Sequence, residues 1–186
     1  TPLEETMQAL VDIVRSGKAL YAGISNYPVE AAEYAYNYLR YHDTPCLLHQ
    51  LKYSILHRVP ENEGLLQQAK EAGSGFIAFS PLAQGLLTDR YLGGIPEDSR
   101  AARDFTLKKS SITAELVEKL KKLDEIASDR GQSLAQMALS WVLKDDLVTS
   151  VIVGASSISQ LDDNLQAVMN TDFCEEEIKI INDLTI

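Results

Sequence analysis

Four short apolar segments alternate with helical patterns along this chain, and this alternation limits the folds that the chain can adopt. None of the four segments shows the apolar–polar alternation of a strand with one face in water. Continuous apolar runs are typical of strands in a parallel sheet that is covered on both faces. Four consecutive strand–helix units predict an α/β architecture, either a doubly wound sheet or a (β/α)8 barrel. The apolar segments lie within 19–27, 46–56, 75–87 and 149–157.

Polar residues gather where each predicted strand ends. The dinucleotide-binding pattern G-x-G-x-x-G does not follow the first strand, whereas a barrel builds its site at the carboxyl ends of its strands. The chain has 186 residues and four units, which is half of the eight units and short of the roughly 250 residues that a barrel usually needs. The polar residues are Ser25 and Asn26, Gln50, Ser80 and Gln84, and Ser156 and Ser157.

Charge and cysteine content exclude several classes of protein. The chain has 17 Lys and Arg residues and 27 Asp and Glu residues. The resulting net charge of −10 excludes non-specific binding to nucleic acid. No run of eighteen apolar residues and no basic-then-apolar leader occurs, so we expect no membrane partner. Cys46 and Cys174 lack the paired spacing of a disulfide framework or a zinc site. We therefore expect a cytoplasmic protein without a bound metal.

Local patterns mark the helices. Tyr34, Tyr38 and Tyr41 recur at helical spacing, which indicates a half-buried face or a contact between subunits, with burial in the core favoured. The stretch 88–112 has no clear periodicity, and a loop of that length is typically a lid, a binding loop or disordered. Three pairs have the spacing of a capping box: Thr1 with Glu4, Ser133 with Gln136, and Ser157 with Gln160.

Four motifs follow one another along almost the whole chain: GKALYAGISNY, LLHQLKYSIL, GFIAFSPLAQGLLTDRYLGGIPEDSR and LAQMALSWVLKDDLVTSVIVGASSISQLDDNLQAV. Together they resemble the C-terminal half of an aldo-keto reductase. The chain is most similar to the branch that contains bacterial glyceraldehyde-3-phosphate reductases and potassium-channel β subunits. This resemblance implies a (β/α)8 TIM barrel, of which residues 1–186 form a single α/β unit with strands five to eight.

The same resemblance implies that this chain carries no catalytic residue. The catalytic tetrad of the family (Asp, Tyr, Lys and His) lies on the first four units of the barrel. The opening TPLEETMQAL resembles the helix that starts shortly after the tetrad histidine. His42, His49 and His57 match none of the tetrad positions.

By resemblance, the first three strands hold one end of an NADPH site. Ser25, Asn26 and Gln50 correspond to the residues that hydrogen-bond the nicotinamide carboxamide, which needs both donors and acceptors. Without the resemblance, Ser and Asn at a strand end are more simply turn residues. Phe79 occupies the position whose ring stacks on the nicotinamide, although a Phe on a buried strand is by itself plain core. The turn over the pyrophosphate is formed by Ser80, Pro81, Leu82 and Gly85.

The last strand and the long loop supply the phosphate and adenosine contacts. Gly154 and Ser156 precede a helix whose N-terminal N–H groups favour an anion, and the serines also suit the helix cap; the two roles are compatible. Arg90 and Arg100 are the expected cations for the 2′-phosphate of NADP, and the loop 88–112 is expected to cover the cofactor, with 100–111 poorly ordered in its absence. Gln160, Asp163 and Asn164 line the adenine and ribose side.

The resemblance implies an NADP-dependent reductase of small aldehydes or ketones, of which this chain carries the cofactor-binding half. Two alternatives remain open: a non-catalytic NADPH sensor or scaffold like a channel β subunit, and an inactive remnant. A half barrel leaves strand edges and an apolar face open, which favours a homo-oligomer or a complementing N-terminal half as partner. We expect this chain alone to be inactive.

Overall fold

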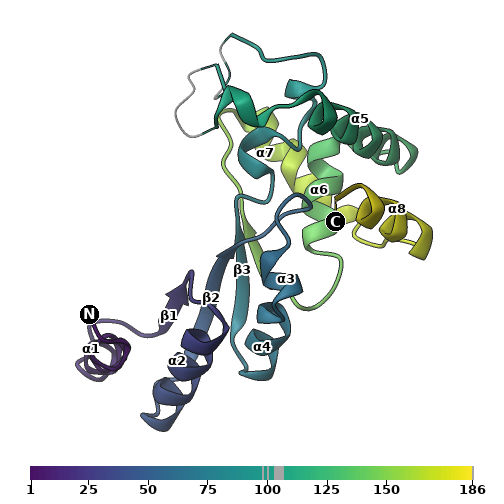
Figure 1. Cartoon of the computed structure of the whole chain (residues 1–186). Helices are drawn as coiled ribbons and strands as arrows, with labels where there is room; N and C mark the ends of the chain where they lie inside the picture. Colours follow the sequence, from purple (N-terminus) through teal and green to yellow (C-terminus); the bar gives the residue numbers. More distant parts are fainter. Residues whose placement is uncertain (98, 100, 103–106, 186) are drawn as a thin grey trace. The chain divides into compact units, whose positions relative to one another are not determined.

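The computed structural model describes residues 1–97, 99, 101–102 and 107–185 (Figure 1). The chain divides into two compact units. The sheet unit contains Thr1–Tyr53, Arg58–Phe79 and Asp145–Val151, and the helical unit contains Ser54–His57, Ser80–Lys144 and Ile152–Ile186.

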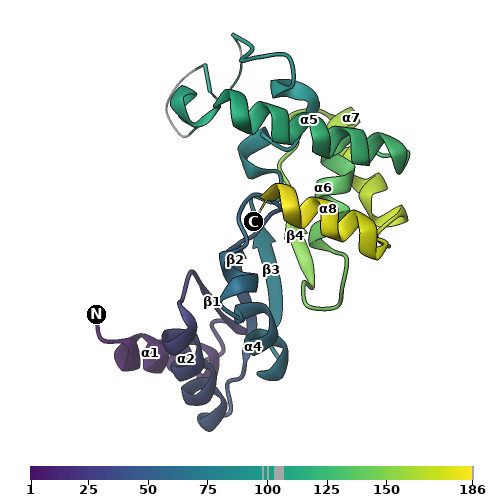
Figure 2. The ribbon, with the colours of Figure 1, turned by 45° about the vertical axis from the view of Figure 1, so that its right-hand side comes forward.

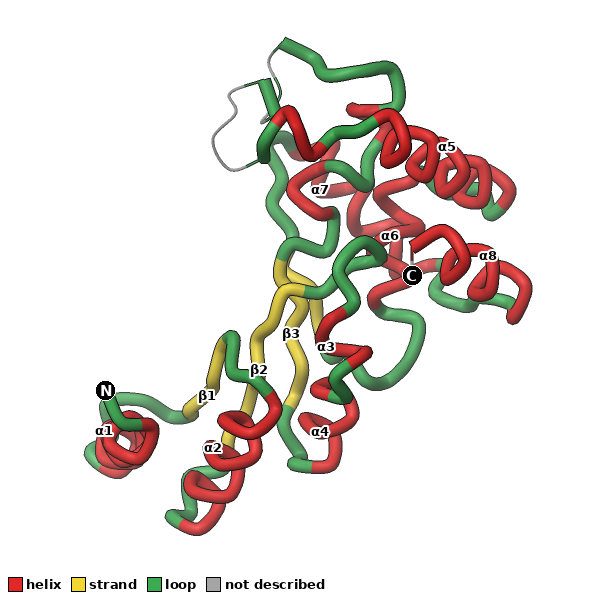
Figure 3. The backbone as a smooth tube through the Cα atoms, viewed as in Figure 1, coloured by secondary structure: helices red, strands yellow, loops and turns green. Residues whose placement is uncertain are grey.

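A four-stranded sheet with the order β1-β2-β3-β4 organises the sheet unit. The pairs β1–β2 and β2–β3 are parallel, and β4 lies next to β3. Figure 3 shows the first three strands side by side. The sequence therefore predicts the parallel α/β arrangement and the sequential strand order correctly. The strands are β1 (Ala22–Ser25), β2 (Cys46–Lys52), β3 (Gly75–Phe79) and β4 (Ser150–Ile152).

Helices bury one face of this sheet. Helix α2 packs against β2, α4 packs against β3, and α1 contacts both β1 and α2. The buried strand residues on this face are Ala22, Ile24, His49, Leu51, Phe76 and Ala78. The helices of the unit are α1 (Leu3–Arg15), α2 (Val29–Tyr41), α3 (Val59–Asn62) and α4 (Leu65–Glu71).

The opposite face of the sheet is only partly covered. Gly23 and Ser25 are exposed there, and Leu48 and Ile77 are half-buried. The prediction that the strands are covered on both faces is therefore wrong for the described residues. Leu48 and Ile77 lie on this partly exposed face. Their apolar side chains made the strand sequences look like continuous apolar runs.

The helical unit holds the remaining helices (Figure 2). Its core includes the fully buried Trp141 of α6 and Leu120 and Leu123 of α5. By contrast, no residue of α7 is buried, and its Ile158 and Leu165 are exposed. The elements are η1 (Ala83–Gly85), η2 (Asp89–Tyr91), η3 (Lys109–Ser111), α5 (Ala114–Asp129), α6 (Leu134–Val142), α7 (Ile158–Leu165), η4 (Gln166–Met169) and α8 (Glu175–Thr185).

Arg130 ties three segments of the helical unit together. Its side chain is 5% exposed, and its Nη1 donates to both carboxylate oxygens of Glu177 in α8 at 2.9 Å. Its Nη2 donates to the carbonyl oxygens of Asn170 and Asp172, and its guanidinium lies 3.7 Å from the centroid of the Phe173 ring. This cluster fixes α8 against the end of α5.

The predicted helix caps form to different extents. Ser133 and Gln136 make a complete capping box at α6. Ser157 caps α7 with its hydroxyl, but the side chain of Gln160 bonds to Ser156 instead of closing the box. The first pair fails, because α1 begins at Leu3 with Pro2 as its cap residue and Pro2 has no side-chain acceptor.

The prediction that Tyr34, Tyr38 and Tyr41 of α2 are buried in the core is wrong. Tyr34 is 40% exposed and Tyr41 is 83% exposed, whereas Tyr36 is 4% exposed. Tyr34 instead stacks on Tyr38, which is half-buried and hydrogen-bonds to Gln8 of α1. Helical spacing identifies residues that share a face, but it does not say which face meets the sheet.

Two further expectations concern membranes and metals. Within the described residues, no helix is both long and apolar enough to cross a bilayer. The same residues contain no group of three or more His, Cys, Asp or Glu side chains arranged to hold a metal ion.

Candidate functional site

The predicted carboxamide-binding residues meet at the carboxyl ends of β1 and β2. Ser25 is the register partner of Gln50, and the backbone N–H of Asn26 donates to the carbonyl oxygen of Gln50 at 3.0 Å. The side-chain amide of Asn26 donates to the hydroxyl of Ser25 at 3.2 Å. Asn26 adopts a left-handed conformation with φ of 59°, which Asn tolerates better than most residues. The structure thus brings these three residues together, and we call them the strand-end set.

The strand-end set offers mixed hydrogen-bonding chemistry. Ser25 and Asn26 are exposed and Gln50 is half-buried. A hydroxyl and two amides supply donors and acceptors at one place, which is what a primary amide ligand requires. Phe79, half-buried at the end of β3, pairs in register with Lys52, two residues beyond Gln50. An aromatic face therefore lies on a strand adjacent to these polar groups.

Behind this strand lies a buried polar pair that the sequence analysis missed. His49 is fully buried, and its Nδ1 lies 2.8 Å from the hydroxyl oxygen of Tyr36 on α2. Burial lowers the pKa of His49 to about 4 and raises the pKa of Tyr36. The neutral ring thus holds β2 to the helix layer. The period of two along β2 was the available signal, since it places His49 on the face opposite Gln50.

The predicted pyrophosphate turn follows β3 and belongs to the helical unit. Ser80 has φ of 54° and Gly85 has φ of 96°, and the N–H of Ala83 donates to the carbonyl oxygen of Ser80 at 2.9 Å. The N–H groups of Gly85 and Leu87 both donate to Leu82. Pro81, the second residue of the turn, is buried. The chain therefore folds tightly at this turn, and glycine meets the left-handed requirement at its end without steric cost.

Thr88 and Arg90 continue from this turn. The hydroxyl of Thr88 donates to the carbonyl oxygen of Gly85 at 2.7 Å and accepts from the backbone N–H of Arg90. Arg90 is exposed at the start of the long loop. Arg100 lies outside the described residues, as do 103–106, so the expectations for Arg100 and for the order of 100–111 stay predictions.

The N-terminus of α7 carries the second group of predicted residues in the helical unit. Both the backbone N–H and the hydroxyl of Ser156 donate to Oε1 of Gln160, at 2.8 and 2.9 Å. Gly154 is exposed, and a Cβ placed on it would have no neighbour within 4 Å. The structure thus links Ser156 to Gln160 directly.

Asp163 has a structural role that the sequence analysis did not anticipate. Its Oδ1 accepts from the side chain of Gln136 at 2.7 Å, and its Oδ2 accepts from the hydroxyl of Ser133 at 3.3 Å. The residues that form the capping box of α6 therefore also hold α7. Asn164, the last predicted residue of this group, is half-buried. The helical unit thus gathers one group of predicted residues around the turn after β3 and another around α7.

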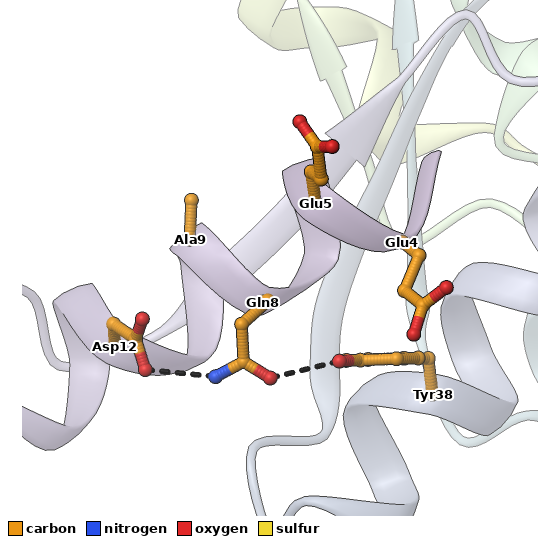
Figure 4. Close-up of a pocket in the computed structure, with 6 residues that line it drawn as sticks. All are labelled: Glu4, Glu5, Gln8, Ala9, Asp12 and Tyr38. Atoms are coloured by element: carbon orange, nitrogen blue, oxygen red, sulfur yellow. Dashed lines mark hydrogen bonds between the residues drawn. The ribbon is translucent and has the colours of Figure 1, made fainter. Parts of the chain in front are cut away.

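A separate pocket of about 420 Å³ lies between α1 and α2 (Figure 4). Gln8 crosses it, donating to Asp12 and accepting from the hydroxyl of Tyr38, both at 2.8 Å. The carboxylates of Glu4, Glu5 and Asp12 line the pocket, and none of its lining residues belongs to the predicted site. Three carboxylates repel phosphate, so this pocket does not suit a phosphate-bearing cofactor.

Comparisons with known proteins connect these features. A model of the "Aldo/keto reductase family" matches residues 1–186. L-glyceraldehyde 3-phosphate reductase of Escherichia coli (strain K12) is 48% identical over 186 residues, which cover 98% of this chain and 54% of the relative. A putative voltage-gated potassium channel subunit beta of Schizosaccharomyces pombe is 32% identical, covering 95% of this chain and 53% of the relative.

Solved structures of aldo-keto reductases also resemble this chain. The thermostable aldo-keto reductase Tm1743 superposes with a TM-score of 0.73 at 29% identity, covering 99% of this chain and 55% of that structure. The aldo-keto reductase AKR11C1 from Bacillus halodurans, in a holo form, has a TM-score of 0.71 at 29% identity, covering 100% of this chain and 57% of that structure. The chain spans about half the length of the relatives that it matches.

Proposed function

Because the chain belongs to the aldo/keto reductase family, we propose that it supplies the cofactor-binding half of an NADP-dependent reductase of aldehydes and ketones. The observation that carries the proposal is the strand-end set, in which Ser25, Asn26 and Gln50 present hydroxyl and amide groups at one edge of a parallel sheet. Amide-recognising residues are what a nicotinamide site needs.

The chain forms strands five to eight of a (β/α)8 barrel. The sequential order of four strands supports this assignment, because consecutive strands of a barrel are neighbours. The half-buried Leu48 and Ile77 of the sheet and the exposed Ile158 and Leu165 of α7 are apolar side chains that further strands and helices would cover. A complementing N-terminal half is therefore the partner of this chain, and a second copy is the alternative.

The strand-end set binds the nicotinamide carboxamide. The side chains of Gln50 and Asn26 each offer an acceptor and donors to the ligand amide, and Ser25 adds a hydroxyl. The half-buried ring of Phe79 supplies an aromatic face for stacking. When bound, NADPH supplies the hydride that reduces the substrate carbonyl. These residues orient the nicotinamide ring and take no part in proton transfer.

The helical unit binds the phosphates and the adenosine. The turn from Ser80 to Gly85 and the N-terminus of α7 present backbone N–H groups to phosphate, and Ser156 adds a hydroxyl. Arg90 and Arg100 provide cations for the 2′-phosphate. Gln160, Asp163 and Asn164 face the adenosine, with Asp163 also joined to α6.

No residue of this chain takes a catalytic role in the proposal. His49 is fully buried on the helix side of β2, away from the face that carries Gln50, so it does not reach a carbonyl bound there. The proton donor to the reduced carbonyl oxygen must come from the complementing half. Both cysteines are free thiols, which supports a cytoplasmic location for the protein.

An NADPH sensor without turnover is the second candidate function. The observation that favours it is the 32% identity to a protein described as a putative potassium channel subunit beta. A sensor binds NADPH as tightly as the reductase does but leaves carbonyl compounds unreduced. Turnover assays therefore separate the two functions, since both predict cofactor binding.

The test uses protein expressed from the complete coding sequence. We expect Gln50→Ala to weaken NADPH binding about tenfold, the effect of losing paired hydrogen bonds, and to leave binding of 2′-phospho-ADP-ribose unchanged because that ligand lacks nicotinamide. Gln67→Ala is the matched control, because Gln67 is exposed and bonds only to Glu71 among the described residues. Failure of the wild-type protein to bind NADPH contradicts the proposal.

A further inference from the structure

Lys52 places a cation beside the proposed nicotinamide subsite. It is the last residue of β2, and it lies two positions beyond Gln50 on the same face of the sheet. Its register partner is Phe79. Two residues of strand advance the chain by about 6.6 Å, so Lys52 lies roughly one side-chain length beyond the residue that would bind the carboxamide.

No acid neutralises Lys52 within the part of the chain that the structure describes. Two other described lysines are half-buried, and each has an interaction: Lys119 lies 3.4 Å from Glu115, and the Nζ of Lys144 lies 4.0 Å from the centroid of the Trp141 ring. No salt bridge or hydrogen bond of Lys52 is found among these residues. Among the half-buried lysines that the structure describes, Lys52 is therefore the one whose ammonium has no ion pair, hydrogen bond or ring contact.

The acid that follows β2 most closely is already paired. Glu61 accepts from Arg58 through both of its carboxylate oxygens, at 2.7 and 2.8 Å, and it also accepts from the hydroxyl of Tyr53 at 3.0 Å. A carboxylate held by a bidentate guanidinium has little capacity left for a second cation. Glu61 thus leaves the ammonium of Lys52 available.

An ammonium that no carboxylate neutralises, two strand positions beyond Gln50, can make a charge-assisted hydrogen bond with an anionic ligand. In a protein of net charge −10, a cation at this position also offsets the general repulsion of anions. We infer that Lys52 binds the anionic group, phosphate or carboxylate, of the carbonyl substrate and thereby selects charged over neutral aldehydes. This inference rests on the proposed reductase function, because the carbonyl must lie against the nicotinamide that Gln50 and Phe79 would hold.

The substrate, rather than the cofactor, is the ligand that fits this position. Lys52 belongs to the strands that carry the proposed carboxamide and ring contacts. The turn proposed for the pyrophosphate begins at Ser80, directly after Phe79, so the Kd for NADPH of Lys52→Met distinguishes a contact to the substrate from a contact to the cofactor. A small carbonyl compound whose reacting carbon lies near the nicotinamide has its anionic group only a few bonds away.

The experiment uses the protein from the complete coding sequence and two pairs of substrates. The pairs are glyceraldehyde 3-phosphate with glyceraldehyde, and succinic semialdehyde with butanal. For Lys52→Met we expect kcat/KM to fall about tenfold or more for one or both anionic substrates, the effect of losing a charge-assisted hydrogen bond, and to stay within about twofold for the neutral partners. The substrate pair that responds identifies phosphate or carboxylate as the group bound.

Two further variants make the result specific. Lys52→Arg keeps the charge and should restore most of the activity on the anionic substrate. Lys122→Met removes an exposed lysine of α5 and should change no parameter. The Kd for NADPH, measured by fluorescence, should be the same in all four proteins.

The outcomes separate the inference from the proposed function. An equal loss on charged and neutral aldehydes, a raised Kd for NADPH, or unchanged kinetics in Lys52→Met would overturn the role of Lys52 while leaving a working reductase. A wild-type protein that reduces none of the four aldehydes overturns the reductase function and, with it, this inference.

Discussion

The hydroxyl oxygen of Tyr36 lies 2.8 Å from Nδ1 of His49, and both side chains are buried between α2 and β2. The other ring nitrogen of His49, Nε2, has no hydrogen-bond partner among the described residues. A proton added to this ring would place a charge in an apolar layer next to the ring of Phe76. The pair therefore makes the sheet unit sensitive to acid.

The first prediction concerns this sensitivity. The pKa of His49 is about 4 in the folded protein, below the value of about 6.5 for an exposed His. The unfolded chain therefore binds the proton first, and the stability contributed by the neutral ring is fully present above pH 6.5 and is lost as the pH falls to 4. We expect a loss of about 2–3 kcal/mol over this window, measured by urea unfolding at a series of pH values.

A variant isolates this effect from the titration of carboxylates. His49→Gln should be less stable at pH 7 but should lose less stability than the wild type between pH 6.5 and 4. His42→Gln, which changes a partly exposed ring tilted against Tyr38, should keep the wild-type pH dependence. Identical pH profiles for His49→Gln and the wild type would refute the assignment.

The second prediction concerns Arg130. Arg130→Met removes the guanidinium that holds Glu177 and two backbone carbonyls, and it leaves the partly buried carboxylate without a cation and with the backbone N–H of Cys174 as its donor. Breaking such a pair costs about 3–5 kcal/mol. We expect faster amide hydrogen exchange in α8 than in α6, because α8 is held by this contact.

The control for Arg130 is a charge on the surface. Lys121→Met breaks an exposed pair with Glu118 on α5 and should cost less than about 1 kcal/mol. If both variants lose the same small amount of stability, the Arg130 cluster does not anchor α8.

The third prediction concerns the spacing of β1 and β2. A Cβ added at Gly23 would lie 2.9 Å from the carbonyl oxygen of Leu48, so the two strands would have to move apart. We expect Gly23→Ala to cost about 1–3 kcal/mol and to weaken NADPH binding, since Ser25 and Gln50 follow on the same strands. Gly93→Ala, where the added atom meets nothing within 4 Å, should leave the free energy of unfolding unchanged.

The fourth prediction concerns the 186-residue chain alone. It should reduce neither glyceraldehyde nor a nitrobenzaldehyde with NADPH, because in the proposed function the proton donor comes from outside this chain. Its exposed apolar residues on α7 should also make it self-associate in light scattering. Turnover by a chain confirmed by mass spectrometry to begin at Thr1 contradicts the first part, and a stable monomer contradicts the second.

Sequence patterns predicted the order of the strands and the position of Ser25 and Gln50 at strand ends, because the carboxyl ends of parallel strands share an edge. They did not predict the burial of Tyr36 or the hydrogen bonds between Asp163 and residues of the α6 capping box. Both depend on which side of a helix meets its neighbour, and that choice is made by packing between segments far apart in the chain. Helical spacing gives the relative positions of Tyr34, Tyr36 and Tyr38 but carries no information about the sheet.

The strand order also has a consequence for how this protein is made. The pairs β1–β2 and β2–β3 each join consecutive strands through one intervening stretch, so they can form soon after these residues leave the ribosome. The strand β4 is synthesised only after 80–149, which includes α5 and α6. Closing so long a loop costs more chain entropy and slows the pairing. The sheet unit is therefore completed late, by a strand that arrives after much of the helical unit has been synthesised.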